Sequence, residues 1–95
     1  MKLPVDYRTL DWRKGEVRRV REQYIKEQDG VCMYCKALLK YDPPDHIFEA
    51  EINWGLFPPN FQKHPVHLQH SHDTHMTEGA VHMRCNAYMW QYEGR

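Results

Sequence analysis

Three cysteines and one histidine in this chain are spaced as two pairs of metal ligands. Two residues separate Cys32 from Cys35, and two residues separate His82 from Cys85. Two such pairs, each on a turn, have the spacing of a structural zinc site with four ligands. Thiolate and imidazole groups also suit the tetrahedral geometry of Zn²⁺. We therefore expect a structural Zn²⁺ that, in a chain of 95 residues, is coupled to folding.

Two alternatives to this ligand set stay open at the level of sequence. A neighbouring histidine such as His75 is able to take the place of His82 as the fourth ligand. Cys32 and Cys35 taken alone also match a redox dithiol, but no βαβ pattern surrounds them. Three cysteines is an odd number, which argues against a complete disulfide framework.

A second group of residues lies in the stretch HLQHSHDTHMTEGAVHMRCN, residues 67–86. Together with the upstream Cys-x2-Cys, it resembles the HNH nucleases, also called His-Me finger or ββα-metal nucleases. The similarity is greatest to their recombination endonuclease VII branch. It covers residues 30–35 and 67–90, and it leaves out residues 1–10 and 41–65. The combination of these parts is specific, whereas any one of them alone is not.

The resemblance implies a fold, an activity and a set of roles. The fold would be α+β, a small zinc-stabilised ββα-metal domain, and the activity would be a metal-dependent DNA endonuclease that nicks DNA or cuts branched DNA. His70 matches the general base that takes a proton from the attacking water. Asn86 matches the residue at the head of the last helix that holds the catalytic divalent metal, Mg²⁺ or Mn²⁺, or orients the site. Cys32, Cys35 and Cys85 match zinc ligands, and His82 replaces the fourth cysteine of the family.

The chemistry of these side chains agrees with such a role. Phosphodiester cleavage needs a base that titrates near neutral pH, as histidine does. It also needs a cation to stabilise the charge on the phosphate and on the leaving oxygen. A histidine on a strand and an asparagine on a helix are rigidly positioned if zinc joins the elements.

One residue departs from the family pattern in the centre of this group. Gln69 occupies the position of the acidic metal ligand, and a neutral amide oxygen binds Mg²⁺ less strongly than a carboxylate. His67, His72 or Asp73 are candidates to replace that ligand, and a histidine would favour Mn²⁺, Ni²⁺ or Zn²⁺. His67 and His72 also fit a packing or supporting role. The alternative function is a catalytically degenerate zinc-binding module that binds DNA or a host protein.

The elements that position these groups are predicted from residue patterns. Residues 1–10 are expected to form an extended arm and residues 11–30 a basic helix, with Asp11 as its N-cap and a secure start at Glu16. Asp29-Gly30 is expected to end this helix. The apolar stripe of the helix consists of Val17, Val20, Tyr24 and Ile25.

Charge is distributed unevenly between the two parts of the chain. Residues 1–40 contain ten Lys and Arg against six Asp and Glu, and residues 41–95 contain three against seven. A basic helix beside an acidic metal-binding half favours contact with a phosphate backbone, although a solvated helix face has the same composition. The residues expected to contact DNA are Arg13, Lys14, Arg18, Arg19 and Arg21.

The rest of the chain is expected to form the zinc-binding and catalytic parts. Residues 31–40 are predicted to be the first zinc knuckle, residues 41–65 an ordered loop with one short strand, and residues 66–95 the ββα-metal core. In this core the second strand is expected at residues 79–82 and the helix at residues 85–92. His46 and His64 are expected at the surface, and Tyr88, Met89 and Trp90 in the hydrophobic core.

Length and composition set the remaining expectations. The 95 residues are sufficient for a single domain, and MKLPVDYRTLDW at the start has no apolar segment typical of a signal peptide. We expect a cytoplasmic protein without a membrane partner, in a bacterial host cell if a phage encodes it. Duplex or branched DNA is the expected partner, and a homodimer is open.

Overall fold

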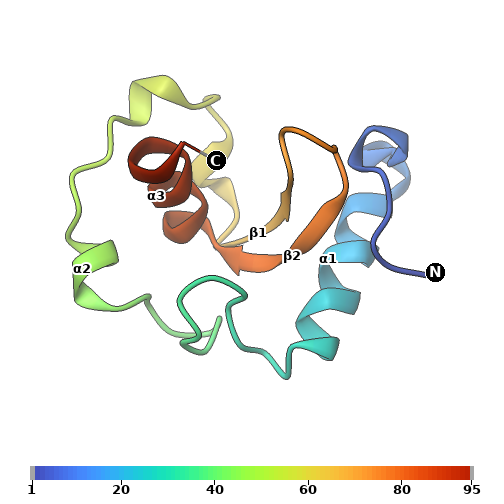
Figure 1. Ribbon diagram of the computed structural model, residues 1–95, viewed down its shortest axis with the longest axis horizontal. Coiled ribbons are helices and arrows are strands. Elements are labelled where there is room, and N and C mark those ends of the chain that lie inside the picture. The colour runs from blue at the N-terminus through green and yellow to red at the C-terminus, as the bar shows by residue number, and fades with distance from the viewer. Residues whose placement is uncertain (1, 95) are drawn as a thin grey trace.

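A β-hairpin followed directly by a helix forms the centre of the molecule. The computed structural model describes residues 2–94, with antiparallel strands β1 (Val66–His70) and β2 (Thr77–His82) and helix α3 (Met83–Glu93). The predicted order of strand, strand and helix is confirmed (Figure 1). β2 begins two residues before the predicted strand, and α3 also begins two residues early, because no loop separates β2 from α3.

Helix α1 (Glu16–Glu27) packs against the hairpin. Asp11 caps a separate turn of 3-10 helix, Trp12–Lys14, where its carboxylate accepts a hydrogen bond from the amide of Arg13. Gly15, with φ of 73°, lies between this turn and α1. The predicted helix over residues 11–30 is therefore too long at its start, because a left-handed residue interrupts it.

The C-terminal end of α1 is joined to β2 by a side chain. Gln28 accepts a hydrogen bond from the amide of Ala80 (2.9 Å) through Oε1, and Nε2 donates to the carbonyl oxygens of Ala80 (3.0 Å) and Val31 (2.7 Å). A Cβ atom at Gly79 would lie 2.8 Å from Oε1 of Gln28 and 2.9 Å from Cγ of Met33. The close approach of these elements therefore requires glycine at position 79.

Residues 41–65 wrap around α3 on the left of Figure 1. They form helix α2 (Asp45–Phe48) and two turns of 3-10 helix, Trp54–Leu56 and Phe61–Lys63. The predicted short strand is wrong: the structure has no strand in this segment, whose apolar residues pack towards α3.

Arg84 of α3 holds the same segment in place. Its Nη1 donates to the carbonyl oxygen of Phe48 (3.0 Å), and its guanidinium lies over the rings of Phe48 (4.8 Å) and Trp54 (5.5 Å). Cation–π contacts of this kind position an arginine as well as the aromatic rings that surround it.

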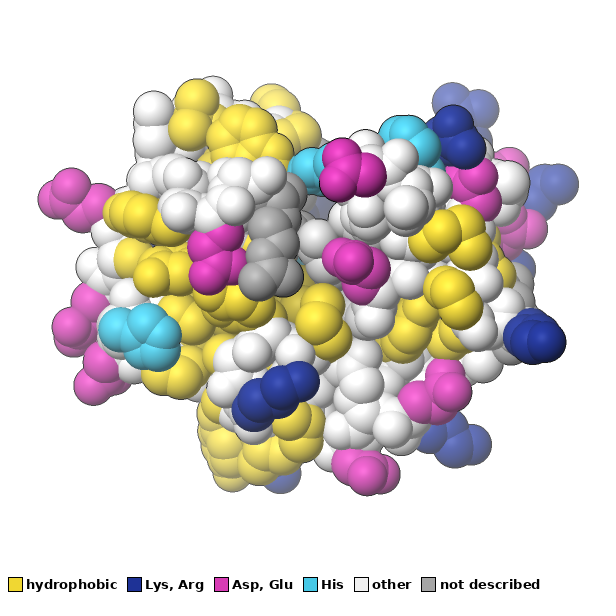
Figure 2. Space-filling model, in the orientation of Figure 1, with side chains coloured by type: hydrophobic (Ala, Val, Ile, Leu, Met, Phe, Trp, Pro, Cys, Tyr) yellow, Lys and Arg dark blue, Asp and Glu magenta, His cyan; other side chains and the backbone are white. Residues whose placement is uncertain are grey.

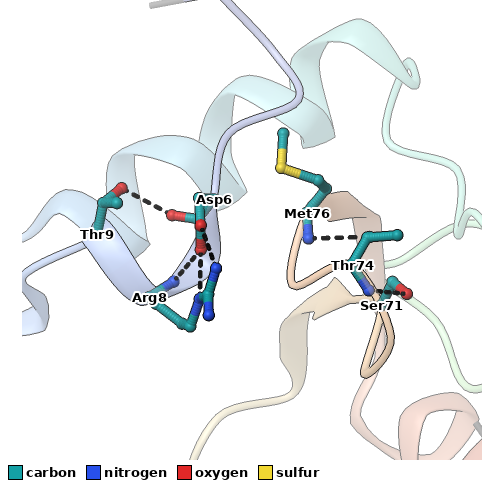
Figure 3. A network of polar contacts seen from close by, with 6 residues as sticks. All are labelled: Asp6, Arg8, Thr9, Ser71, Thr74 and Met76. Atoms are coloured by element: carbon teal, nitrogen blue, oxygen red, sulfur yellow. Dashed lines mark hydrogen bonds and ion pairs between the residues drawn. The ribbon is translucent and has the colours of Figure 1, made fainter.

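The arm at the N-terminus lies beside the end of the hairpin. Val5 and Thr77 exchange two hydrogen bonds, from the amide of Val5 to Oγ1 of Thr77 (3.0 Å) and from the amide of Thr77 to the carbonyl of Val5 (2.8 Å). Figure 3 shows the polar contacts within the arm, around Asp6, facing those of the loop between β1 and β2. The arm is therefore an ordered part of the structure.

The hydrophobic core lies between the hairpin, α3 and the segment around the first two cysteines. Its buried members are Cys32, Leu39, Ile47, Ala80, Val81, Cys85 and Met89. Met89 is in the core as predicted and Tyr88 packs against it, but Trp90 is 42% exposed, so its predicted place in the core is wrong. Trp90 lies instead against Phe57 of the wrapping segment. None of the described helices is long and apolar enough to span a membrane.

Candidate metal centre and active-site cleft

The four predicted zinc ligands come together at one point of the structure. The sulfur atoms of Cys32, Cys35 and Cys85 and a ring nitrogen of His82 all lie within 4.8 Å of one another. Nδ1 of His82 is 3.4 Å from Sγ of Cys35 and 3.5 Å from Sγ of Cys85. In a tetrahedral zinc site, a sulfur ligand and a nitrogen ligand are roughly 3.6 Å apart. The cluster is therefore compatible with zinc.

The imidazole of His82 is oriented for metal binding. Its Nε2 lies 2.8 Å from the carbonyl oxygen of Tyr41 and 3.1 Å from that of Leu38. Carbonyl groups only accept hydrogen bonds, so Nε2 carries the proton and Nδ1 presents a lone pair to the three sulfur atoms. His75 lies in the loop between β1 and β2, outside this cluster, so His82 is the histidine of the group.

The three thiols interact strongly with one another. A hydrogen bond from Cys85 lowers the pKa of Cys32, and the same contact raises the pKa of Cys85. Burial raises the pKa of Cys35. Three thiolates in a largely buried cluster repel one another unless a cation neutralises them, which is what a divalent metal supplies. A redox dithiol would not require Cys85 and His82 beside the first pair.

A cleft of about 450 Å³ lies next to the hairpin, between α1 and the arm on one side and α3 and the wrapping segment on the other. Figure 2 shows hydrophobic side chains gathered over α3 and this segment. The cleft contains His67, Gln69, His70, His72 and Asn86, which are the predicted catalytic and candidate cation-binding residues. Asp73 is exposed and is not among the lining residues.

His67 and Asn86 fix one another inside the cleft. Nε2 of His67 lies 2.9 Å from the carbonyl oxygen of Phe61 and must donate to it. Nδ1 is then an acceptor, and the amide nitrogen of Asn86 donates to it over 3.0 Å. Burial lowers the pKa of His67 to about 4, which keeps the ring neutral. Both ring nitrogens are occupied, so His67 orients Asn86 and is not itself a free ligand.

The orientation of the Gln69 amide also follows from its hydrogen-bond partners. Gln69 is only 4% exposed, and its Nε2 donates to the carbonyl oxygen of His70 (3.0 Å) and to Oε1 of Glu78 (3.4 Å). Its own Oε1 accepts no hydrogen bond from the described residues, and within residues 2–94 every fully buried side-chain oxygen has a partner. Oε1 therefore contacts solvent, as does Oδ1 of Asn86. Each side chain offers one carbonyl oxygen.

The imidazole of His70 is positioned by contacts with two neighbouring rings and not by hydrogen bonds from the described residues. The ring of Tyr7 stacks on it with centroids 4.0 Å apart and planes at 10°, and His72 approaches at 5.3 Å. Within residues 2–94, neither ring nitrogen of His70 has a hydrogen-bond partner. Partial burial, followed by the charges of His72 and His75, lowers the pKa of His70. The ring is therefore neutral near pH 7 and able to accept a proton.

The electrostatic environment of the cleft is unusual for a cation site. Among the described residues that line the cleft, none is Asp or Glu. Arg21 is the one lysine or arginine among them. The other predicted DNA-binding residues are placed elsewhere: Arg13 lies over the ring of Trp12, and Arg19 donates to the carbonyl of Lys14 (3.0 Å). Arg18 is exposed. Most Lys and Arg side chains visible in Figure 2 lie along the edge formed by α1 and the arm.

Sequence patterns did not indicate two parts of this site. The first is Tyr7, from the arm. The second is an aromatic wall formed by Phe57, Phe61 and Trp90, in which the ring centroid of Phe57 lies 4.5 Å from that of Phe61 and 5.4 Å from that of Trp90. The only signal in the sequence was the clustering of aromatic residues before β1. His46 and His64 are exposed, in agreement with their predicted surface positions.

Comparisons with protein-family models, with curated proteins and with solved structures found no match for this chain. The function is therefore inferred from the geometry of the cleft and of the cluster beside it. The two share one turn of α3, because Cys85 belongs to the cluster and Asn86 to the cleft.

Proposed function

We propose that this protein is a metal-dependent DNA endonuclease of the HNH, or ββα-metal, type, with His70 as the general base. The observation that carries this proposal is the content of one cleft. It holds a neutral histidine whose ring nitrogens have no hydrogen-bond partner within residues 2–94, and two amide oxygens, from Gln69 and Asn86, that contact solvent. A base next to a pair of oxygen ligands supplies the two kinds of group that metal-assisted hydrolysis of a phosphodiester uses.

Each residue has a specific task in this mechanism. His70 takes the proton from the attacking water, and Arg21 binds a phosphate oxygen of the substrate. Oδ1 of Asn86 and Oε1 of Gln69 would hold a divalent cation, with His72 as a further candidate ligand. When bound, the cation supplies positive charge that stabilises the phosphate and the leaving 3′ oxygen. The N-terminal end of α3, where Asn86 lies, adds favourable dipole charge.

The ligand set supports Mn²⁺ over Mg²⁺ as the catalytic cation. Mg²⁺ is usually bound through one or two carboxylates, and no described residue of the cleft supplies one. Amide oxygens together with the imidazole of His72 are better suited to Mn²⁺ or Ni²⁺. Gln69 therefore changes the expected metal preference, while the general base stays in place.

A plasmid assay tests this function. Zinc-loaded, folded protein is incubated with supercoiled plasmid and Mg²⁺, Mn²⁺ or Ni²⁺, and the formation of nicked circles is measured. We expect nicking with Mn²⁺ or Ni²⁺ and its loss in His70→Ala. His46→Ala is the matched control, because His46 is an exposed histidine that is not among the residues that line the cleft. Failure of the folded protein to nick with every metal would refute the proposal.

The second candidate is a degenerate module that keeps the zinc cluster and binds DNA or a host protein without cutting. The lack of a carboxylate among the described lining residues favours it. This alternative requires that reversal of charge at Arg18 and Arg19 abolishes binding while His70→Ala has no effect. Cleavage that depends on His70 would exclude it.

A further inference from the structure

The N-terminal arm contacts the proposed general base, although no metal or catalytic motif includes it. The ring of Tyr7 lies parallel to the ring of His70, with centroids 4.0 Å apart and an interplanar angle of 10°. Tyr7 also lines the cleft. A residue from the first turn of the chain is thus part of the wall of the candidate active site.

The arm is anchored firmly enough to fix this ring. The amide of Tyr7 donates to the carbonyl of His75 (2.8 Å), and Val5 pairs with Thr77 through two hydrogen bonds. Oγ1 of Thr77 is also 2.9 Å from the hydroxyl of Tyr24, which ties this point to α1. The hydrogen bonds on both sides of Tyr7 leave little freedom for its backbone, and its ring is placed against His70.

The turn that carries Tyr7 has its own local support (Figure 3). Asp6 accepts hydrogen bonds from the amide of Arg8 (2.9 Å) and from its guanidinium (2.8 and 3.1 Å). Thr9 Oγ1 donates to the carbonyl of Asp6 (2.7 Å). The guanidinium of Arg8 holds the pKa of Asp6 down at about 2, so this carboxylate is charged at neutral pH. The turn is therefore held by an ion pair together with the hydrogen bonds around Asp6.

Face-to-face stacking limits the rotation of the imidazole and leaves its edge accessible. Both nitrogen atoms are on that edge, and neither is used by a hydrogen bond within residues 2–94. On this basis we propose that Tyr7 is a positioning residue, which holds the edge of the His70 imidazole toward the cleft. This inference rests on the proposed endonuclease function and adds to it a residue from outside the recognised motif.

The role of Tyr7 predicts a particular pattern of kinetic change. The phenyl ring of phenylalanine stacks as tyrosine does, whereas leucine fills the space without a flat face. Tyr7→Leu should lower kcat for plasmid nicking by roughly 3- to 10-fold, the rate equivalent of losing one aromatic pair, with KM nearly unchanged. Tyr7→Phe should keep the wild-type kcat. Tyr92→Leu is the matched control, because Tyr92 is 51% exposed and lies outside the cleft.

A second measurement reports on the stack without catalysis. In two-dimensional NMR spectra of protein with labelled histidines, the ring protons of His70 should be shifted upfield by the ring of Tyr7, with His70→Ala providing the assignment. The shift should disappear in Tyr7→Leu and remain in Tyr7→Phe and Tyr92→Leu. Zinc content and thermal unfolding of each variant show that it is folded.

The two measurements separate the possible failures. If the wild-type protein nicks plasmid and Tyr7→Leu has the same kcat, the positioning role is overturned. The same holds if Tyr7→Phe lowers kcat as much as Tyr7→Leu does. An unchanged His70 spectrum in Tyr7→Leu would overturn the stack itself. Absence of nicking by wild-type protein with every metal, while the NMR shift behaves as expected, would refute the endonuclease and leave the stack established.

Discussion

The amide nitrogen of Asn86 lies 3.0 Å from Nδ1 of His67, and this contact determines which atom Asn86 presents to the cleft. Nε2 of His67 donates to Phe61, so the ring accepts from Asn86, and the carbonyl oxygen of Asn86 faces the other way. In the proposed mechanism, His67 would thus act on the cation indirectly, through the orientation of an oxygen ligand. Such supporting contacts are a general feature of metal sites.

Removal of the His67 side chain should weaken binding of the proposed catalytic cation. We expect His67→Ala to lower the apparent affinity for Mn²⁺ in the nicking assay by about 10- to 100-fold, the usual effect of losing a residue that orients a ligand. The measurement is a titration of nicking rate against Mn²⁺ concentration. His64→Ala is the control, since His64 is exposed at the same cleft and has no hydrogen bond to Asn86. Equal Mn²⁺ dependence in wild type and His67→Ala would show that Asn86 needs no such orientation.

Replacement of Gln69 by a carboxylate should change the metal preference. In Gln69→Asp we expect nicking with Mg²⁺ to rise relative to Mn²⁺, because a carboxylate binds this hard cation more strongly than an amide oxygen. The variant also loses the donor to His70 and Glu78, which should cost about 1–3 kcal/mol of stability without added cation. Parallel metal titrations and denaturant unfolding measure both effects. An unchanged ratio of Mg²⁺ to Mn²⁺ activity would argue against position 69 as a ligand.

Removal of the structural metal should unfold the protein. The core contains Cys32 and Cys85, so the metal site and the hydrophobic core are one unit. We expect a strong chelator, or Cys85→Ser, to abolish the cooperative thermal transition, because structural zinc contributes directly to folding. Circular dichroism with parallel determination of zinc content provides the measurement. Return of the transition after zinc is added back is the control, and a folded zinc-free chain would contradict the expectation.

Addition of a methyl group at Gly79 should destabilise the contact between α1 and β2. The new Cβ atom would overlap Oε1 of Gln28 and Cγ of Met33, so these side chains or the backbone of β2 must shift. We expect Gly79→Ala to lower the free energy of unfolding by about 1–3 kcal/mol. Gly55→Ala is a matched control, because its Cβ atom would meet only the side-chain oxygen of Asn53, at 3.2 Å. Equal denaturant midpoints for the two variants would contradict the proposed overlap.

The basic residues of the first half should contribute unequally to DNA binding. Arg21 lines the cleft, whereas the guanidinium of Arg19 is bonded to the carbonyl of Lys14. We expect Arg21→Ala to weaken binding to duplex DNA and to reduce the slope of log affinity against log salt by about 1. Arg19→Ala should have a smaller effect on both quantities. The reverse order in a fluorescence anisotropy titration would indicate that DNA is bound along the outer face of α1.

The zinc ligands and the order of elements were predictable because the relevant signals are local. Each of these signals depends on residues that are close together in the sequence. They are the two Cys and His pairs with short spacings, the alternation of residues after Val66, and the apolar stripe that includes the buried Val20. The orientation of His82 was not predictable, since it depends on carbonyl groups of the segment after the knuckle, at Leu38 and Tyr41.

The parts that sequence did not predict depend on contacts between distant segments. Tyr7 meets His70 only because the arm pairs with the end of the hairpin, and Phe61 contacts His67 through a backbone oxygen that has no sequence signature. The strand expected within residues 41–65 fails for a related reason. Its apolar residues pack around α3, so their pattern reflects packing and not the alternation of a sheet.

Gln28 has a further consequence for how copies of this protein can associate. A two-stranded sheet normally leaves its outer backbone groups available to a strand from another molecule. On the outer side of β2, the side chain of Gln28 forms hydrogen bonds with the amide and the carbonyl of Ala80, and the amide of Met33 donates to the same carbonyl. The amide of Thr77 donates to the carbonyl of Val5. Strand addition at β2 is thereby blocked within a single chain. A homodimer that forms by strand addition must therefore use the outer edge of β1.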